Sequence, residues 1–329
     1  MGVSIRVGWA TIEPTEGVFS WTYLDSEIGR ATAAGKIVML RISTQTGKPA
    51  WVTTAIKNSG GKFFQFIDAG VPSEFPVYWD PVFLAKKKAL IAAVGARYGN
   101  NPTVKIVTAS FANATSEDWS VPHETADVTQ WLSLGYTTAK LLDAGNQMID
   151  ATMAAFPTAF VTVAINGNGH TGQGPNLDPD SDYVARNVAL TAEASWPGRF
   201  IIQKNSLSTF NPASPGTGSN WEVVWDNAPR NGAQMLYWVA NETTYRMNGG
   251  VKGDPATVLH NAINAGLSYG LRYLEIYQTD IINYPAETTY AKNALSGQPT
   301  PTPTPKPSAT PTPTPPSAPN PPTGLKIVK

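Results

Sequence analysis

Three glutamates stand at places in the sequence where strands are expected to end. Glu117 comes shortly after the β-branched segment that starts at Val104, Glu242 follows Ala233–Ala240, and Glu275 lies within Leu271–Gln278. In a barrel of repeated strand–helix units the loops after the strands open on one face, so carboxylates there can converge on a substrate from distant parts of the sequence. Glu117 is the first catalytic candidate among them.

The second carboxylate has two candidates. Glu275 lies between Leu274 and Ile276, so its side chain points either into the mouth of a barrel or into an apolar helix layer, and the second placement is costly for a charge. Glu242 lies beside Asn241 in a polar segment that is typical of an exposed loop. We therefore place Glu275 ahead of Glu242 and keep both.

The elements that carry these acids alternate between strand and helix patterns. This alternation predicts an α/β fold with a parallel sheet, a TIM-type (β/α)8 barrel over residues 1–297. The barrel is expected to lack its first strand, since seven strands are predicted: Ser4–Trp9, Lys36–Ser43, the segment from Val104, Ala159–Asn166, Arg199–Asn205, Ala233–Ala240 and Leu271–Gln278. A doubly wound open sheet is the alternative, but no strand is followed by a glycine-rich phosphate loop.

Two connections carry further expectations. The segment from Thr44 to Trp79 holds many aromatic residues and is predicted to be a long loop that walls a cleft. A single helix is predicted from Thr129 to Phe156, and Asp80 with Pro81 predicts the start of the helix before Val104.

Polar and aromatic side chains at the strand ends are candidates for sugar binding. Such sites combine hydrogen-bonding groups with flat apolar faces for pyranose rings. Trp9 and Trp238 fit an ordinary core equally well. The hydrogen-bonding candidates are Arg6, Arg41, Asn166, Gln203, Asn205 and Tyr277, and the ring candidates are Trp9, Trp51, Trp79, Trp119 and Trp238.

The composition narrows the possible partners. With 24 basic and 24 acidic residues the formal net charge is zero, which favours an uncharged partner over nucleic acid or a membrane surface. The chain has no cysteine, and its three histidines are far apart without a metal-binding spacing. We expect neither a metal nor a cofactor.

The C-terminal segment differs from the rest of the chain. Residues 298–322 consist almost entirely of Pro, Thr, Ser and Ala, so we expect an extended spacer without a core. Residues 323–329 (TGLKIVK) have the pattern of a strand that begins a further module, tethered through this linker. Linkers of this kind are typical of secreted, modular enzymes, so an extracellular location is expected.

Three segments resemble barrel glycoside hydrolases of the clan A type, which includes family 42 β-galactosidases and family 5 cellulases. They are Arg6–Leu40 (RVGWATIEPTEGVFSWTYLDSEIGRATAAGKIVML), the helix before Asn101 and Pro102, and the position of Glu117 beyond the strand that would be the fourth. The resemblance implies a first strand before Ser4–Trp9, Glu117 as the acid/base and a nucleophile after the seventh strand, which favours Glu242. Many members have Asn-Glu where this chain has Ser116-Glu117.

Together these features predict a secreted glycoside hydrolase that cleaves β-linked poly- or oligosaccharides, by a mechanism that retains the anomeric configuration. A non-catalytic carbohydrate-binding barrel is the alternative from another class. A polysaccharide lyase is a third, but the neutral charge does not favour an acidic substrate.

Overall fold

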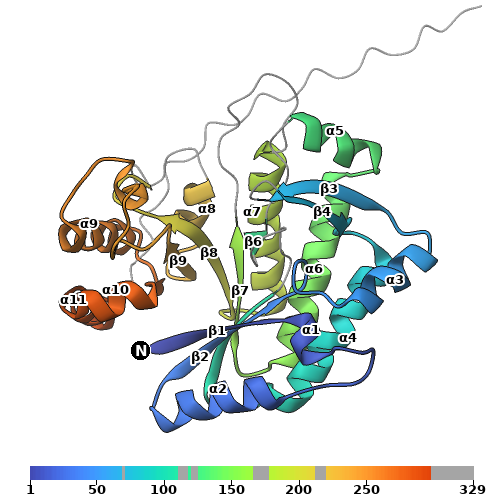
Figure 1. The fold of residues 1–329 in the computed structure, drawn as a ribbon, viewed down its shortest axis with the longest axis horizontal. Helices are drawn as coiled ribbons and strands as arrows, with labels where there is room; N and C mark the ends of the chain where they lie inside the picture. The colour runs from blue at the N-terminus through green and yellow to red at the C-terminus, as the bar shows by residue number, and fades with distance from the viewer. Residues whose placement is uncertain (69–70, 110–117, 120–124, 166–177, 212–219, 298–329) are drawn as a thin grey trace, which may run out of the picture.

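The computed structural model describes residues 1–68, 71–109, 118–119, 125–165, 178–211 and 220–297. Its centre is one parallel sheet whose strands follow each other in chain order (Figure 1). The strands are β1 (Gly2–Gly8), β2 (Ile37–Ser43), β5 (Val104–Thr108), β7 (Phe160–Ile165), β8 (Phe200–Leu207), β9 (Asn231–Met235) and β10 (Tyr273–Glu275), and the short β6 (Asp118–Trp119) also pairs with β7.

The sheet curls into a half-barrel of seven parallel strands with helices around it, which confirms the predicted TIM-type fold. Every pairing along it is parallel, from β1 with β2 to β9 with β10. Within the described residues β1 and β10 are the two ends of the sheet and do not pair with each other. This open edge agrees with the expectation of a barrel one strand short.

Helices cover the outside of the sheet, and α4 (Pro81–Tyr98), α6 (Thr138–Ala155) and α7 (Asp178–Ser195) lie side by side along one flank (Figure 1). In β2 the residues Val38, Leu40 and Ile42 belong to a buried apolar cluster with residues of the helices Thr22–Ala33, Ala50–Asn58 and Pro81–Tyr98. The helices are α1 (Trp9–Ile12), α2 (Thr22–Ala33), α3 (Ala50–Asn58), α4 (Pro81–Tyr98), α5 (Thr125–Ser133), α6 (Thr138–Ala155), α7 (Asp178–Ser195), α8 (Asn220–Asp226), α9 (Pro255–Ser268), α10 (Gln278–Asn283) and α11 (Pro285–Gly297), and a 3-10 turn covers Arg246–Asn248.

The start of α4 follows the predicted capping. The side chain of Asp80 accepts a hydrogen bond from Phe83 N at 2.8 Å, and Pro81 occupies the first helical position. Asp254 and Pro255 begin α9 in the same way, with a bond of 2.9 Å from Thr257 N. These helices are therefore fixed at the N-terminal end by local sequence.

Two predictions about the segments between the strands are wrong. The segment 44–79 is not an open loop, because it holds α3 and an antiparallel hairpin of β3 (Phe63–Asp68) and β4 (Val71–Pro76). Phe64 and Phe75 of this hairpin are buried, and Phe64 packs against both Phe75 and Trp131, so the hairpin belongs to the core. The helix predicted over 129–156 is broken into α5 and α6 at Gly135, whose φ of 89° no helix accommodates.

The strand predicted over 233–240 ends earlier, at Met235. The backbone amides of Val239 and Ala240 donate to the buried carboxylate of Asp280, at 3.0 Å and 2.9 Å, instead of to a neighbouring strand. Burial raises the pKa of Asp280, and these two amides act against that shift. A side chain from α10 thus ends the strand, which the local sequence does not indicate.

Among the described helices, none combines the length and the apolar character needed to cross a membrane.

Candidate active site

Glu275, the last residue of β10, meets side chains from strands on other sides of the barrel. Its Oε1 accepts a hydrogen bond from Gln203 Nε2 of β8 at 2.6 Å and an ion pair from Arg41 Nη2 of β2. Because β2 and β10 are not neighbours in the sheet, this contact can form only across the barrel interior. The structure therefore places Glu275 inside the barrel, as its apolar sequence neighbours predicted.

Both contacts reach the same oxygen of Glu275. Within the described residues no hydrogen bond to the other oxygen, Oε2, is found. The side chain of Glu275 is 18% exposed, whereas that of Arg41 is only 2% exposed. A buried guanidinium beside a carboxylate gives a strong charge-assisted bond and fixes the carboxylate orientation.

A chain of hydrogen bonds orients Gln203 behind this pair. Gln203 is completely buried, its Nε2 also donates to Asn205 Oδ1 at 2.6 Å, and its Oε1 accepts a bond from the Tyr273 hydroxyl. The Tyr273 hydroxyl lies 3.3 Å from the hydroxyl of Thr162. Burial, followed by the charge of Glu275, raises the pKa of Tyr273, so the phenol stays protonated and remains a donor. Because the Tyr273 hydroxyl donates to Gln203 Oε1, the amide nitrogen of Gln203 is the atom that faces Glu275.

Aromatic rings lie beyond the ends of β9 and β10. Tyr237 and Trp238 stack with ring centroids 3.7 Å apart, and Trp238 lies 5.5 Å from Tyr277. Gln234, which faces Glu275 in the strand register, donates to the Tyr277 hydroxyl at 3.1 Å. Trp238 and Tyr277, both predicted as binding residues, are half-buried and adjacent to each other.

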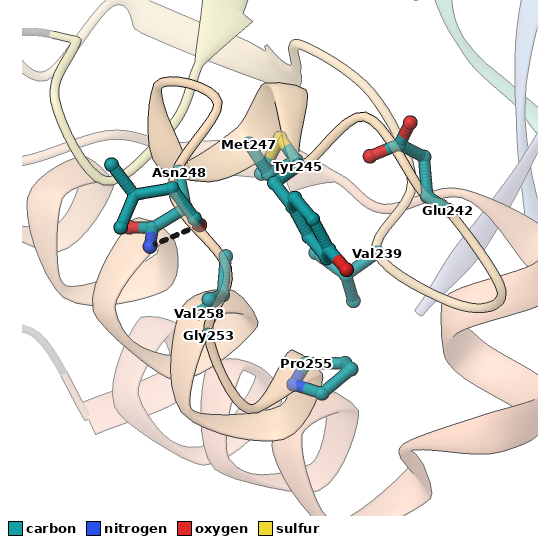
Figure 2. A pocket seen from close by; sticks show the side chains of 9 residues that line it. Val239, Glu242, Tyr245, Met247, Asn248, Gly253, Pro255 and Val258 are labelled. Atoms are coloured by element: carbon teal, nitrogen blue, oxygen red, sulfur yellow. Dashed lines mark hydrogen bonds between the residues drawn. The ribbon is translucent and has the colours of Figure 1, made fainter.

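Glu242, the second candidate, has a different environment. Its carboxylate accepts the backbone amides of Thr244 at 2.7 Å and Arg246 at 3.1 Å, and also the Thr244 hydroxyl. The Thr244 hydroxyl, followed by these amides, lowers the pKa of Glu242. Glu242 borders a small pocket together with Tyr245 and Pro255, on the loop before α9 (Figure 2). It stabilises its own turn, and no strand-borne polar side chain contacts it among the described residues.

The remaining predicted residues lie at several places. Glu117 and Asn166 lie outside the described residues, and Trp119 contributes its backbone to β6. Arg6 lies beside Arg41 in the register of β1 and β2 and is exposed.

Three predicted tryptophans pack against protein. Trp9 is 0% exposed, with its Nε1 bonded to Glu13 at 2.8 Å and its ring stacked on Phe83, so the prediction that it offers a face to sugar is not supported. Trp51 bonds to the Glu13 carbonyl at 3.2 Å, and Trp79 packs against Trp131. Both are half-buried.

Sequence reasoning missed Tyr273, Gln234 and Thr162. The signal for Tyr273 is its spacing of two from Glu275, because alternate residues of a strand share one face. Gln234 could have been found as a polar residue between the apolar residues Ala233 and Met235 of a short strand. The described residues contain no group of three acidic or histidine side chains that could hold a metal ion.

Comparisons with known proteins agree with this barrel. Residues 3–148 match the family model of glycoside hydrolase family 42, described as β-galactosidase. The structure is similar to β-galactosidase from Marinomonas ef1, with a TM-score of 0.51 and 11% identity over 83% of this chain and 49% of that one. The β-galactosidase from the haloarchaeon Halorubrum lacusprofundi gives 0.50 and 13% over 83% and 48%.

The fold is a TIM-type barrel similar to that of these β-galactosidase structures. The resemblance inferred from Arg6–Leu40 is thus confirmed by the family match over the N-terminal part of the chain. The barrel spans about half the length of the β-galactosidase structures that it matches. A search of curated proteins found no match.

Proposed function

We propose that this chain is a β-glycosidase that uses two carboxylates, with Glu275 as the nucleophile and Glu117 as the acid/base. The observation that carries the proposal is the convergence of Arg41 and Gln203 on Oε1 of Glu275 inside the barrel. Support also comes from the family match, which covers the segment that contains Glu117.

Each residue has a stated part in the reaction. Oε2 of Glu275 attacks the anomeric carbon while the glycosidic bond breaks, and the leaving oxygen takes its proton from Glu117. Water then cleaves the glycosyl ester, with Glu117 accepting the proton. Arg41 and Gln203 hold the carboxylate in place, and the Tyr237–Trp238 pair is the proposed platform for the sugar ring.

The proposed substrates are β-galactosides, because the similar structures are β-galactosidases and the family model carries the same description. An uncharged sugar fits the neutral composition. Secretion is also part of the proposal and is supported by the Pro/Thr-rich segment 298–322, which is typical of exported modular enzymes.

Trapping of the covalent intermediate tests the proposal. A 2-deoxy-2-fluoro-β-galactoside with a dinitrophenyl leaving group slows both steps, because fluorine disfavours the oxocarbenium-like transition state. The good leaving group lets the ester form, so we expect one fluoroglycosyl group on the peptide that contains Glu275. Peptide mass spectrometry locates it, and Glu275→Gln should prevent labelling while Glu242→Gln is labelled normally.

Three outcomes would contradict parts of the proposal. A label on the Glu242 peptide would make Glu242 the nucleophile, as the position in the clan implies. Turnover with inverted product and no label would exclude a covalent intermediate. Sugar binding without turnover over a panel of aryl β-glycosides would favour the non-catalytic barrel.

A further inference from the structure

The turn that follows β9 carries Trp238, and a buried carboxylate from another part of the chain holds this turn. The carboxylate belongs to Asp280 of α10, which is completely buried. Its Oδ1 accepts hydrogen bonds from the backbone amides of Val239 at 3.0 Å and Ala240 at 2.9 Å, and its Oδ2 lies 3.1 Å from the same Val239 amide. Hydrogen bonds to a charged acceptor are stronger than those between neutral groups. The two residues after Trp238 are therefore fixed in position.

The carboxylate of Asp280 serves a distant segment rather than its own helix. A carboxylate in the first turn of a helix commonly interacts with the free amides of that turn. Asp280 lies in the first turn of α10, yet its side chain bonds to amides 40 and 41 residues earlier in the chain. No lysine or arginine among the described residues pairs with this carboxylate. Because a buried charge is costly unless it is hydrogen-bonded, the carboxylate and the two amides hold each other in place.

Asp280 is also close in sequence to the strand that carries Glu275. The chain runs from Glu275, the last residue of β10, through Tyr277 to the start of α10. The backbone amide of Asp280 donates to the carbonyl of Tyr277 at 3.0 Å, and the ring of Tyr277 packs against Trp238 with centroids 5.5 Å apart. One short segment after Glu275 therefore contacts the Trp238 turn twice, through a ring and through a carboxylate.

Trp238 is the ring of the proposed platform that has a face to offer. Tyr237 stacks on one face of Trp238 at 3.7 Å, and the guanidinium of Arg246 lies 4.4 Å from the centre of the Tyr237 ring. Since a ring has two faces, Tyr237 is enclosed between Trp238 and Arg246. Tyr277 is 6.5 Å from Tyr237, and a ring on the far face of Trp238 would be more distant, so Tyr277 packs at the edge of Trp238. No ring among the described residues covers that far face.

We propose that Asp280 is a positioning residue, whose carboxylate holds the turn after β9 so that the ring of Trp238 stays at the edge of Tyr277 and binds the sugar that Glu275 attacks. The inference rests on the proposed function, because it assigns the platform a part in substrate binding. Asp280 acts through the two backbone amides and does not touch the sugar. Without this acceptor the amides turn to solvent, and the ring of Trp238 loses its fixed place.

A fluorine label on tryptophan tests the hold of Asp280 on Trp238 without an assay of activity. The chain labelled with 5-fluorotryptophan is compared by fluorine NMR with Trp238→Phe, which identifies the Trp238 resonance by its absence. In Asp280→Ala this resonance should shift and broaden, and in Asp280→Asn, which keeps one acceptor oxygen, it should shift less. Asp254→Ala is the matched control, because Asp254 caps α9 by accepting a bond of 2.9 Å from Thr257 N, and it should leave the resonance unchanged.

Kinetics on an aryl β-galactoside test the consequence for the substrate. Stacking on Trp238 stabilises the bound substrate and the transition state alike, so KM should rise at least roughly tenfold in Asp280→Ala while kcat stays within about threefold. A merely structural defect would reduce the amount of active enzyme and lower kcat at an unchanged KM. The double variant Asp280→Ala with Trp238→Ala should have the KM of Trp238→Ala alone, because Asp280 acts through this ring.

An unchanged Trp238 resonance in the Asp280 variants would overturn the proposal. So would a fall in kcat at constant KM, or a double variant whose KM rises by the product of the two single effects. Asp280→Asn supplies each of these comparisons if Asp280→Ala does not fold. A wild type that turns over no β-galactoside would contradict the proposed function, and the Trp238 resonance would still decide whether Asp280 holds this ring.

Discussion

Glu275 and Glu242 are the same residue type in two regions that use a carboxylate differently. Glu275 is held by side chains that lie 72 and 234 residues away in the sequence, on β8 and β2. Glu242 is held by groups two to four residues away, the backbone amides of Thr244 and Arg246 and the Thr244 hydroxyl. The first arrangement exists only when the barrel is assembled, whereas the second stabilises a turn. A position where distant strands converge is therefore the better indicator of chemistry.

The largest expected effect separates the two carboxylates by activity. Glu275→Gln keeps the size of the side chain but removes its nucleophilic charge, so kcat on an aryl β-galactoside should fall by at least roughly 10³-fold. Glu242→Gln should retain activity within about twofold, because the hydrogen bonds of Glu242 to the described residues all lie within its own turn. Steady-state kinetics of both purified variants measure this, and circular dichroism confirms that each is folded.

The opposite ranking, with Glu242→Gln inactive and Glu275→Gln active, would reverse the comparison. Equal and large losses in both variants would show that the loop of Glu242 contributes to the site.

The second expected effect concerns the partner of Glu275. Arg41→Met leaves the carboxylate without its buried counter-charge, so we expect kcat/KM to fall by about 10²-fold and the free energy of unfolding by about 3 kcal/mol. Denaturant titration measures the loss. Arg30→Met is the control, because Arg30 pairs with Glu27 at the surface and its side chain is 76% exposed. That change should cost less than about 1 kcal/mol.

A double variant sharpens this prediction. If the two charges stabilise each other, Arg41→Met combined with Glu275→Gln should be less destabilised than the sum of the single changes. Additive losses would show that the pair contributes nothing by its coupling.

The sequence predicted some of this site and not the rest, for physical reasons. The strand around Glu275 was recognisable because Leu274 and Ile276 need burial, which leaves only the barrel interior for the acid between them. The contact between Arg41 and Glu275 was not predictable, since it depends on how far the sheet curls. The end of β9 was missed because the amides of Val239 and Ala240 bond to Asp280, a residue about forty positions later.

The aromatic residues show the same limit of prediction from the sequence. Trp9 and Trp238 both follow strand-like sequence and looked alike as sugar-binding candidates. The structure buries Trp9 completely against Phe83, while Trp238 stays half-buried beside Tyr277. Local sequence gives the position along the strand, but which neighbours cover the ring is decided by tertiary packing.

A buried lysine in the helix layer can be compared with the buried Arg41. Lys87 of α4 is 3% exposed, and its Nζ lies 4.9 Å from the ring centre of Phe83. Burial lowers the pKa of Lys87 to about 7, from the ordinary value of 10.5 for a lysine. Unlike Arg41, this cation can lose its proton when burial becomes too costly.

The sign of the pH dependence follows from this shift. Between about pH 7 and pH 10.5 the unfolded chain holds a proton on Lys87 that the folded chain has lost, so stability should rise with pH across that window. Below pH 7 both states are protonated, and the folded state then carries the buried charge. Lys87→Met removes this cost, so the variant should exceed the wild type in free energy of unfolding by a few kcal/mol at pH 6, and by less at pH 9.

Denaturant titrations at the two pH values measure the difference between variant and wild type, which cancels the titration of other groups. Lys88→Met on the same helix is the matched control, because the Nζ of Lys88 donates to Gln147 at 2.9 Å from a half-buried position. The gain in free energy of unfolding over the wild type should change more between pH 6 and pH 9 for Lys87→Met than for the control. An equal gap, or a Lys87→Met variant that is less stable at pH 6, would show that the ammonium is stabilised by its surroundings, as the guanidinium of Arg41 is.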